Sequence, residues 1–289
     1  MHLPCRGETK ALNDFSRTLA SGRFVQLTGG LTHYRLSGPD MGKTAVLVHG
    51  IAGPFGIWQR VTESLTVRGI RVLEYDLYGR GYSDRPDVTY DIDLFLTQLR
   101  ELLVALRIDH PFTLVGWSLG GMIAAAYTAR FPKEVGRVVL IAPAGIDVSL
   151  PAISRFGMAP VLGDMLMSLV GRRLVLKSLA RGLHRREFES DYGGLISEQM
   201  QYRGYLRAFL STLRNCVCRD SSKDFQAIGV LDIPVSMISG SEDQTIPLSA
   251  RDKIAQLIPN IVCREIEDAG HVPQIERPEA LNSLLAEFV

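Results

Sequence analysis

A serine flanked by glycines stands where the sequence changes from an apolar run to a helical pattern. In the stretch GWSLGG, Gly116 and Gly120 lie two residues before and two residues after Ser118. Small residues at these places permit a tight, strained turn between a strand and a helix, because larger side chains would collide across the bend. Such a turn exposes the serine hydroxyl at the amino end of a helix, although an ordinary helix N-cap serine fits the same surroundings. The spacing therefore indicates a candidate nucleophile.

A serine hydroxyl is a weak nucleophile, so this chemistry also requires a base and a group that orients the base. Two later segments supply both. The segment MISGSEDQTIP ends an apolar run and places Asp243 in a turn, and the segment EIEDAGHVPQIERPE places His271 in a loop before the last helical pattern. Glu242 and Asp268 are the other acidic candidates. The residues therefore allow a relay of serine, acid and histidine in that chain order.

Short β-rich runs alternate with longer helical patterns along the chain. The later runs are nearly continuous in apolar residues, as expected for strands that are covered on both faces. The alternation predicts an α/β protein with a mostly parallel central sheet, right-handed crossovers and flanking helices. The expected strands are RFVQLTG, LTHYRLSG, TAVLVHG, RVLEYDLYG, FTLVG, RVVLIAP, VSMISG and IVCREIE, and the expected helices cover residues 58–68, 90–106, 119–131, 249–257 and 278–288.

The alternation is interrupted between residues 147 and 227, where helical spacing continues with glycine and proline punctuation and no convincing strand. We therefore expect a helical cap over residues 147–227, inserted into an α/β core of residues 23–146 and 228–289. Residues 1–22 are expected to form an amino-terminal arm that packs as a short helix or is partly mobile.

Five motifs occur in the order found in the α/β-hydrolase fold family, which the chain resembles over residues 24–289. The resemblance implies a mostly parallel central sheet, flanking helices and a helical cap insertion. Within the family, the single-residue oxyanion motif after the His-Gly pair resembles that of esterases and lipases with a helical cap. The five motifs are LVHGIAG, DLYGRGYSDRP, GWSLGG, SGSEDQTIP and AGHVPQIERPE.

The resemblance also implies a role for individual residues. Ser118 would attack a carbonyl carbon, His271 would take its proton and later protonate the leaving group, and Asp243 would orient the imidazole and stabilise its charged form. The negative oxygen of the tetrahedral intermediate needs backbone N–H donors, which the resemblance assigns to Ile51 and Leu119.

The position of each acidic residue decides among the candidates. Asp243 stands three residues after Gly240 and matches the family's Gly-x-x-Asp turn, so it is favoured as the third member of the relay. Asp268 is only three residues before His271 and is expected to brace the loop. Asp76, in the motif DLYGRGYSD, follows an earlier strand and is expected to be structural.

The remaining histidines and the cysteines suggest no second site. His49 is expected to be a buried residue that shapes the oxyanion loop, and Trp117 is expected to pack beneath the site. His33, His110 and His184 have no partners at ligand spacing. The four cysteines are too few and too scattered for a zinc site or a disulfide framework. Neither a metal nor another cofactor is therefore expected.

Composition limits the classes of partner and the compartment. The 289 residues are 46% hydrophobic and 22% charged, which suffices for a substantial core, and the formal net charge of +1 gives no electrostatic case for nucleic acid. The cysteine usage fits a reduced compartment. The amino terminus lacks the pattern of a secretory signal, and no apolar run reaches 18 residues. We therefore expect a cytoplasmic protein.

Two segments of the predicted cap suggest binding surfaces. The Met- and Leu-rich residues 158–170 are expected either to line an apolar acyl pocket or to fill the inside of the cap. The segment RRLVLKSLARGLHRR predicts an amphipathic helix with a basic stripe, which is either a solvated face or a surface for an acyl carrier protein, an anionic membrane surface or an anionic substrate group. The basic stripe comprises Arg173, Lys177, Arg181 and Arg185, and the apolar stripe Val175, Leu176, Leu179 and Leu183.

The leading interpretation is a serine hydrolase that cleaves a carboxylic ester or thioester with an apolar acyl group through an acyl-enzyme intermediate. An alternative is a hydrolase of C–C bonds in dienoic ring-cleavage products, which uses the same triad. Its relatives tend to have a longer oxyanion loop rich in glycine and serine and a polar residue before the nucleophile, where this chain has IAGPFG and Trp117. A ligand-binding receptor that retains the triad and a cofactor-free peroxidase side activity also stay open.

Overall fold

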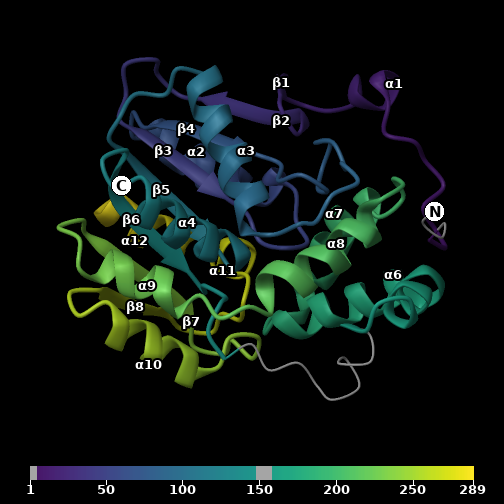
Figure 1. Ribbon diagram of the computed structural model, residues 1–289. Coiled ribbons are helices and arrows are strands. Elements are labelled where there is room, and N and C mark those ends of the chain that lie inside the picture. Colours follow the sequence, from purple (N-terminus) through teal and green to yellow (C-terminus); the bar gives the residue numbers. More distant parts are fainter. Residues whose placement is uncertain (1–4, 148–157) are drawn as a thin grey trace.

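An eight-stranded sheet forms the centre of the computed structural model, which describes residues 5–147 and 158–289 (Figure 1). The strands lie in the order β1-β2-β4-β3-β5-β6-β7-β8; β2 is antiparallel to both of its neighbours, and all later pairs are parallel. Every predicted β-rich run forms a strand, so the predicted α/β fold is confirmed. The strands are β1 (Arg23–Leu27), β2 (Gly30–Ser37), β3 (Thr44–Val48), β4 (Arg71–Tyr75), β5 (Phe112–Trp117), β6 (Val135–Ile141), β7 (Val235–Gly240) and β8 (Val262–Ile266).

Helices cover both faces of the sheet, and β3 illustrates the consequence for the sequence. Its Val46 and Val48 belong to one hydrophobic cluster, whereas Ala45 and Leu47 belong to a second. A strand covered on both faces must be apolar at every position, which explains the unbroken apolar run. The first cluster includes residues of α3 (Ile92–Ala105), α4 (Leu119–Arg130), α9 (Ser222–Gly229) and α10 (Leu248–Leu257), and the second includes residues of α2 (Gln59–Val67) and α12 (Pro278–Phe288).

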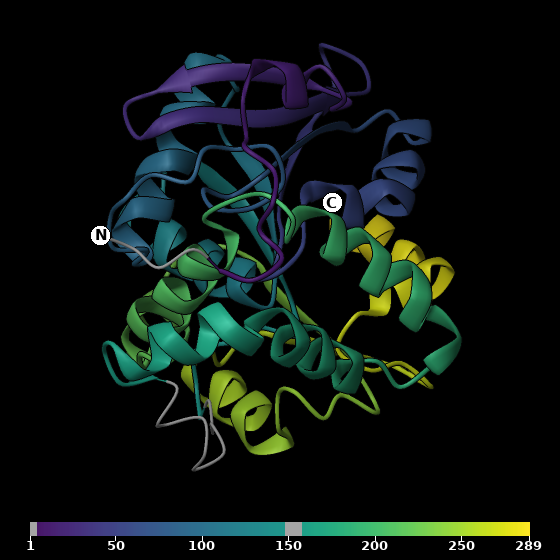
Figure 2. The same ribbon diagram turned by 90° about the vertical axis from the view of Figure 1, so that its right-hand side faces the viewer.

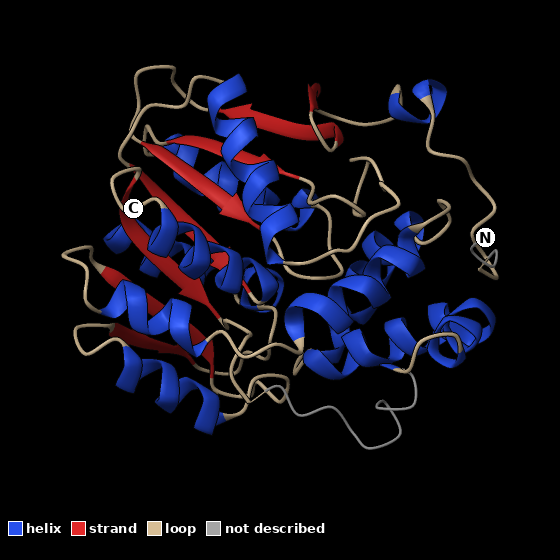
Figure 3. Cartoon of the chain, viewed as in Figure 1, coloured by secondary structure: helices blue, strands red, loops and turns tan. Residues whose placement is uncertain are grey.

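Three helices form a separate layer beside the sheet, and Figure 3 shows that this side holds no strand in the part of the chain that is described. They are α6 (Leu162–Gly182), α7 (Glu189–Gln199) and α8 (Tyr205–Thr212). All three lie within the predicted cap, whereas α9 packs on α4 and α10 of the core, and the predicted boundary at residue 227 falls inside α9. The short segments are α1 (Asp14–Arg17), η1 (Phe55–Trp58), η2 (Arg186–Phe188), the π-helical η3 (Leu213–Val217) and α11 (Pro273–Glu276).

Helix α6 turns its small residues toward the neighbouring helices. Gly163, Ser168 and Gly171 are buried, and a Cβ atom on Gly171 would lie 3.4 Å from Leu206 of α8. This close approach leaves most of the large apolar side chains outside. Residues 158–170 were predicted to line an acyl pocket or to fill the cap. This prediction is wrong for the large apolar side chains that are exposed to solvent. Met167, in contrast, packs against the second cluster. The exposed ones are Val161, Leu162, Met165, Leu166, Leu169 and Val170.

The basic stripe is shorter than the sequence predicts because α6 ends at Gly182. The next residue, Leu183, has an extended backbone, and the carbonyl oxygen of Gly182 accepts a hydrogen bond from the N–H of His271. Arg185 therefore lies beyond the helix, where it forms an ion pair with Glu187, and its assignment to the stripe was wrong. The other three basic residues are exposed on α6.

The amino-terminal arm crosses the layer formed by α6, α7 and α8, here called the cap (Figure 2). The N–H of Arg6 donates to the carbonyl oxygen of Ser168 in α6 over 2.7 Å. The carboxylate of Glu8 accepts hydrogen bonds from the N–H groups of Gly204 (2.9 Å) and Leu206 (2.8 Å). A carboxylate stabilises the amino end of a helix, where the peptide dipoles leave partial positive charge. The arm thus fastens α6 and α8 to the same segment of chain.

Candidate active site

Three side chains that the sequence singles out lie together at the carboxyl ends of parallel strands. Ser118 follows β5, Asp243 follows β7, and His271 lies between β8 and α11. The Oγ atom of Ser118 lies 3.0 Å from Nε2 of His271, and Nδ1 of His271 lies 2.9 Å from Oδ2 of Asp243. All three residues are buried. The fold thus builds one hydrogen-bonded chain from a hydroxyl to a carboxylate, because the carboxyl ends of parallel strands meet at one edge of the sheet.

Ser118 has a backbone conformation that residues other than glycine rarely adopt, with φ 56° and ψ −116°. Two glycines make room for this turn. A Cβ atom on Gly116 would lie 2.1 Å from the carbonyl oxygen of Gly120, and one on Gly120 would lie 2.0 Å from that of Val48. Any larger residue at either position would therefore clash with the backbone. The turn places Ser118 directly before the first residue of α4.

The backbone strain at Ser118 predicts that glycine at this position stabilises the fold relative to alanine. A residue in such a region costs about 1–3 kcal/mol, and glycine avoids most of this cost although it loses more backbone entropy on folding. We expect the free energy of unfolding of Ser118→Gly to exceed that of Ser118→Ala by about 1 kcal/mol. Urea titrations followed by circular dichroism measure the difference. If Ser118→Gly were less stable than Ser118→Ala, the backbone at this position would not be strained.

Asp243 sits in a turn that holds its carboxylate in the charged form. Its Oδ1 atom accepts hydrogen bonds from the N–H groups of Thr245 (2.8 Å) and Ile246 (3.0 Å), while Oδ2 faces His271. Burial raises the pKa of Asp243, but the charge of His271 and the hydrogen bonds to the carboxylate outweigh burial and lower the pKa below its ordinary value. A carboxylate of this kind can orient an imidazole and stabilise its protonated form.

The two rival carboxylates contact other groups. Asp268 forms an ion pair with Arg277 and lies 3.0 Å from Nε2 of His184, and so braces the loop as expected. Glu242 is exposed, and its backbone N–H donates to the carbonyl oxygen of Ala269. Within the described part of the chain, neither carboxylate is hydrogen-bonded to His271.

The loop that carries His271 is fixed from two sides. The indole Nε1 of Trp117 donates to the carbonyl oxygen of His271 over 2.7 Å, and the two rings lie 5.6 Å apart. The N–H of His271 donates to Gly182 at the end of α6, also over 2.7 Å. The core and the cap therefore both position the imidazole.

The two predicted oxyanion donors are the backbone N–H groups of Leu119 and Ile51. Leu119 is the first residue of α4, and the N–H group of a first helical residue has no carbonyl partner within its own helix. The N–H of Ile51 makes no hydrogen bond to another described residue. Just before it, His49 is fully buried, with Nδ1 2.7 Å from the carbonyl oxygen of Gly50 and Nε2 3.0 Å from the N–H of Leu77. Burial lowers the pKa of His49 to about 4, which keeps the ring neutral and suits its expected role in shaping the loop.

Two residues that the sequence does not single out hold the predicted oxyanion loop at Ile51 and Ala52. Arg80 is fully buried, and its guanidinium donates to the carbonyl oxygen of Ile51 over 2.5 Å and to Oγ1 of Thr212 in α8 over 2.8 Å. The hydroxyl of Tyr205 in α8 donates to the carbonyl oxygen of Ala52 over 2.9 Å. A cation between two glycines in an otherwise buried motif could have indicated Arg80, whereas no sequence signal distinguishes Tyr205.

Asp76 has a structural environment, as the sequence predicts. It accepts hydrogen bonds from the N–H groups of Phe55 (2.8 Å) and Tyr82 (2.9 Å), and it lies 2.6 Å from Nδ1 of His33. These contacts come from β2, from η1 and from the loop after β4, and none involves Ser118. The carboxylate therefore ties the loop after β4 to β2 and to η1.

A family model described as alpha/beta hydrolase fold matches residues 44–278, a segment that includes Ser118, Asp243 and His271. The chain belongs to the α/β-hydrolase fold family. The match covers most of the chain and spans both the sheet and the cap helices.

Individual relatives of this α/β hydrolase act on different substrates. It is 30% identical to 2-hydroxy-6-oxo-2,4-heptadienoate hydrolase of Pseudomonas putida, over 93% of this chain and 96% of that protein. It is 21% identical to human monoacylglycerol lipase ABHD6, over 87% and 76% of the two chains. The crystal structure of Cfl2 from Burkholderia cenocepacia superposes with a TM-score of 0.79 at 28% identity and covers 92% of this chain and 94% of Cfl2. These relatives identify a hydrolase without specifying the bond it cleaves.

Proposed function

We propose that this α/β hydrolase cleaves carboxylic esters or thioesters that carry an apolar acyl group. The observation that carries the proposal is the hydrogen-bonded chain from Ser118 through His271 to Asp243 at the start of α4. A serine hydroxyl 3.0 Å from an imidazole nitrogen can transfer its proton to that nitrogen while its oxygen attacks a carbonyl carbon.

The reaction follows from this geometry in two halves. The Oγ atom of Ser118 forms a bond to the carbonyl carbon, its proton moves to Nε2 of His271, and the N–H groups of Ile51 and Leu119 receive the negative oxygen. The C–O or C–S bond then breaks, the leaving group takes the proton from His271, and an acyl-enzyme remains. A water molecule, deprotonated by His271, releases the acid and restores the Ser118 hydroxyl.

Apolar side chains near the oxyanion loop support an apolar acyl group. A Cβ atom on Gly53 would lie 3.7 Å from Ile57 and 3.8 Å from Ile196, and one on Gly56 would lie 3.8 Å from Leu195. The last two residues belong to α7, so the cap presents aliphatic side chains to the loop. Burial of hydrocarbon against such side chains is favourable in proportion to the area removed from water.

A series of p-nitrophenyl esters tests the proposal. We expect kcat/KM to rise from acetyl toward medium-chain acyl groups, by up to about fourfold for each methylene that becomes buried, since one methylene contributes about 0.8 kcal/mol. Acyl thioesters of the same chain lengths form the second arm. A protein that releases at most one equivalent of nitrophenol would instead be a receptor that retains the triad.

A second candidate is hydrolysis of a dienoic ring-cleavage product. It is favoured by the 30% identity to 2-hydroxy-6-oxo-2,4-heptadienoate hydrolase over nearly the whole chain. Assay of that compound beside the esters separates the two candidates. Turnover of the dienoate that exceeds turnover of every ester by orders of magnitude would replace the ester proposal, and the reverse result would support it.

A further inference from the structure

The outward-facing side of α6, here called the outer face, is divided along its length into an apolar half and a basic half. Its residues recur at intervals of three and four, as on one side of a helix. Leu169 keeps 63% of its surface exposed and Leu162 keeps 55%, although both are large hydrophobic residues. The apolar half comprises Leu162, Met165, Leu166, Leu169 and Val170, and the basic half comprises Arg173, Lys177 and Arg181 with the exposed Leu174 between the first two.

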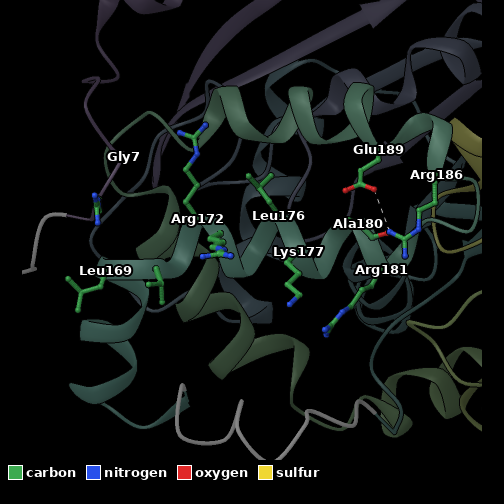
Figure 4. Close-up of a pocket in the computed structure, with 12 residues that line it drawn as sticks. Gly7, Leu169, Arg172, Leu176, Lys177, Ala180, Arg181, Arg186 and Glu189 are labelled. Carbon is green, nitrogen blue, oxygen red and sulfur yellow. Dashed lines mark hydrogen bonds and ion pairs between the residues drawn. The ribbon is translucent and has the colours of Figure 1, made fainter.

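A groove of about 910 Å³ runs along the basic half (Figure 4). Six of its lining residues are cations, and the single carboxylate in the lining, Glu189, is already paired with Arg186 at 3.5 Å. In the described ranges, none of Arg172, Arg173, Lys177 and Arg181 lies in an ion pair. Clustered cations without counter-charges create a positive potential that attracts anions.

Apolar side chains take part in the same groove. Leu169, Val170 and Leu176 line it together with the cations. In Figure 4, Leu169 lies at one end, whereas Arg181 and Arg186 lie at the other. A ligand that contacts the whole groove must therefore carry both negative charge and hydrocarbon.

We propose that the outer face of α6 docks this hydrolase on an anionic phospholipid surface. The leucines and Met165 would enter the boundary between headgroups and acyl chains, while Arg173, Lys177 and Arg181 would pair with lipid phosphates. A bilayer can adapt to protruding leucines, whereas a rigid acidic protein such as an acyl carrier would need a matching apolar cavity. No helix in residues 5–147 and 158–289 is long and apolar enough to cross a membrane.

The docked helix also reaches the candidate active site. The carbonyl oxygen of Gly182, at the end of α6, accepts the hydrogen bond from the N–H of His271. A surface bound along α6 therefore lies on the helix whose last residue contacts His271. Docking itself does not depend on the proposed ester chemistry, so the two can be tested separately.

Flotation with lipid vesicles tests the docking. The full-length protein is mixed with vesicles of neutral phosphatidylcholine, or of phosphatidylcholine with phosphatidylglycerol, at low and high salt. We expect binding to the anionic vesicles alone, and weaker binding as salt rises, because the screening length falls from about 30 Å at 0.01 M to about 3 Å at 1 M. The triple variant Arg173→Gln, Lys177→Gln, Arg181→Gln should bind about 100-fold more weakly, since each basic residue near an anionic surface contributes about fivefold.

Matched variants separate the outer face from general charge and hydrophobicity. Arg23→Gln, Arg68→Gln and Arg219→Gln remove the same charge from exposed positions elsewhere and should bind as the wild type does. Leu166→Gln with Leu169→Gln should weaken binding at least tenfold, whereas Val67→Gln with Val230→Gln, which are exposed at other sites, should not.

Several outcomes would overturn the proposal. They are absence of binding to anionic vesicles, equal binding by the α6 and control variants, and binding of a purified acidic acyl carrier protein to the basic half with no vesicle binding. Hydrolysis of soluble short-chain esters is measured in parallel. If the wild-type protein binds the vesicles but hydrolyses no ester, the proposed ester chemistry is refuted and the docking proposal is unaffected.

Discussion

Ser118→Ala is expected to lower ester hydrolysis by about 10⁶-fold, to the small residual rate that binding and backbone donors provide without a nucleophile. The Oγ atom of Ser118 is the hydroxyl that His271 contacts, at 3.0 Å, so the variant removes the atom that would form the acyl bond. The backbone conformation at φ 56° does not depend on the hydroxyl, and the fold should persist. Steady-state assays with a medium-chain p-nitrophenyl ester and circular dichroism spectra measure the two effects.

A fluorophosphonate provides the control for this assignment. The reagent should label the wild type once, at Ser118, and should leave Ser118→Ala unlabelled, as peptide mass mapping would reveal. Labelling of a different serine, or substantial activity in the alanine variant, would mean that another residue supplies the nucleophile.

Asp243→Asn is expected to lower kcat by about 10⁴-fold with little change in the fold. An amide next to Nδ1 of His271 can present its N–H₂ group, which favours the wrong tautomer of the imidazole and removes the charge that stabilises its protonated form. The backbone donors Thr245 and Ile246 can still bond to the amide oxygen. Pre-steady-state release of nitrophenol measures the loss in acylation.

Asp268→Asn and Glu242→Gln are the matched controls because they change neighbouring carboxylates by the same chemistry. Both should keep most of the activity, since Asp268 pairs with Arg277 and His184 and the Glu242 side chain is exposed. An inactive Asp268→Asn beside an active Asp243→Asn would assign the acid to the loop before His271 instead.

The sheet and the Ser–His–Asp arrangement could be anticipated from the sequence because local rules govern them. The strand β3 is apolar at all five positions because both of its faces are covered, and Gly116 and Gly120 are small because the turn at Ser118 leaves no room. Asp243 could be preferred because it stands three residues after Gly240, which matches the Gly-x-x-Asp turn of the family that the chain resembles. Each signal lies within a few residues of the feature it specifies.

The cap could not be anticipated in the same way, because long-range contacts decide its geometry. Leucines and methionines at helical spacing look the same whether they face inward or outward, and in α6 the small residues Gly163 and Gly171 select the buried side. The helix ends at Gly182, whose carbonyl oxygen accepts a hydrogen bond from the N–H of His271, a residue remote in sequence. Arg80 likewise reaches a partner, Thr212, that lies 132 residues away.

The hydrogen bonds of Glu8 to α8 have a consequence for the order in which the protein matures on the ribosome. Glu8 is synthesised well before its partners Gly204 and Leu206, which lie 196 and 198 positions later in the chain. The arm therefore lacks its partners while β1 to β6 are translated. Glu8 can cap the amino end of α8 only after α8 has emerged from the ribosome. At about 5–20 residues per second this delay is on the order of 10–40 seconds. A bulky group attached just before Glu8 would accordingly hinder the capping of α8, whereas a group attached just after α12 would not.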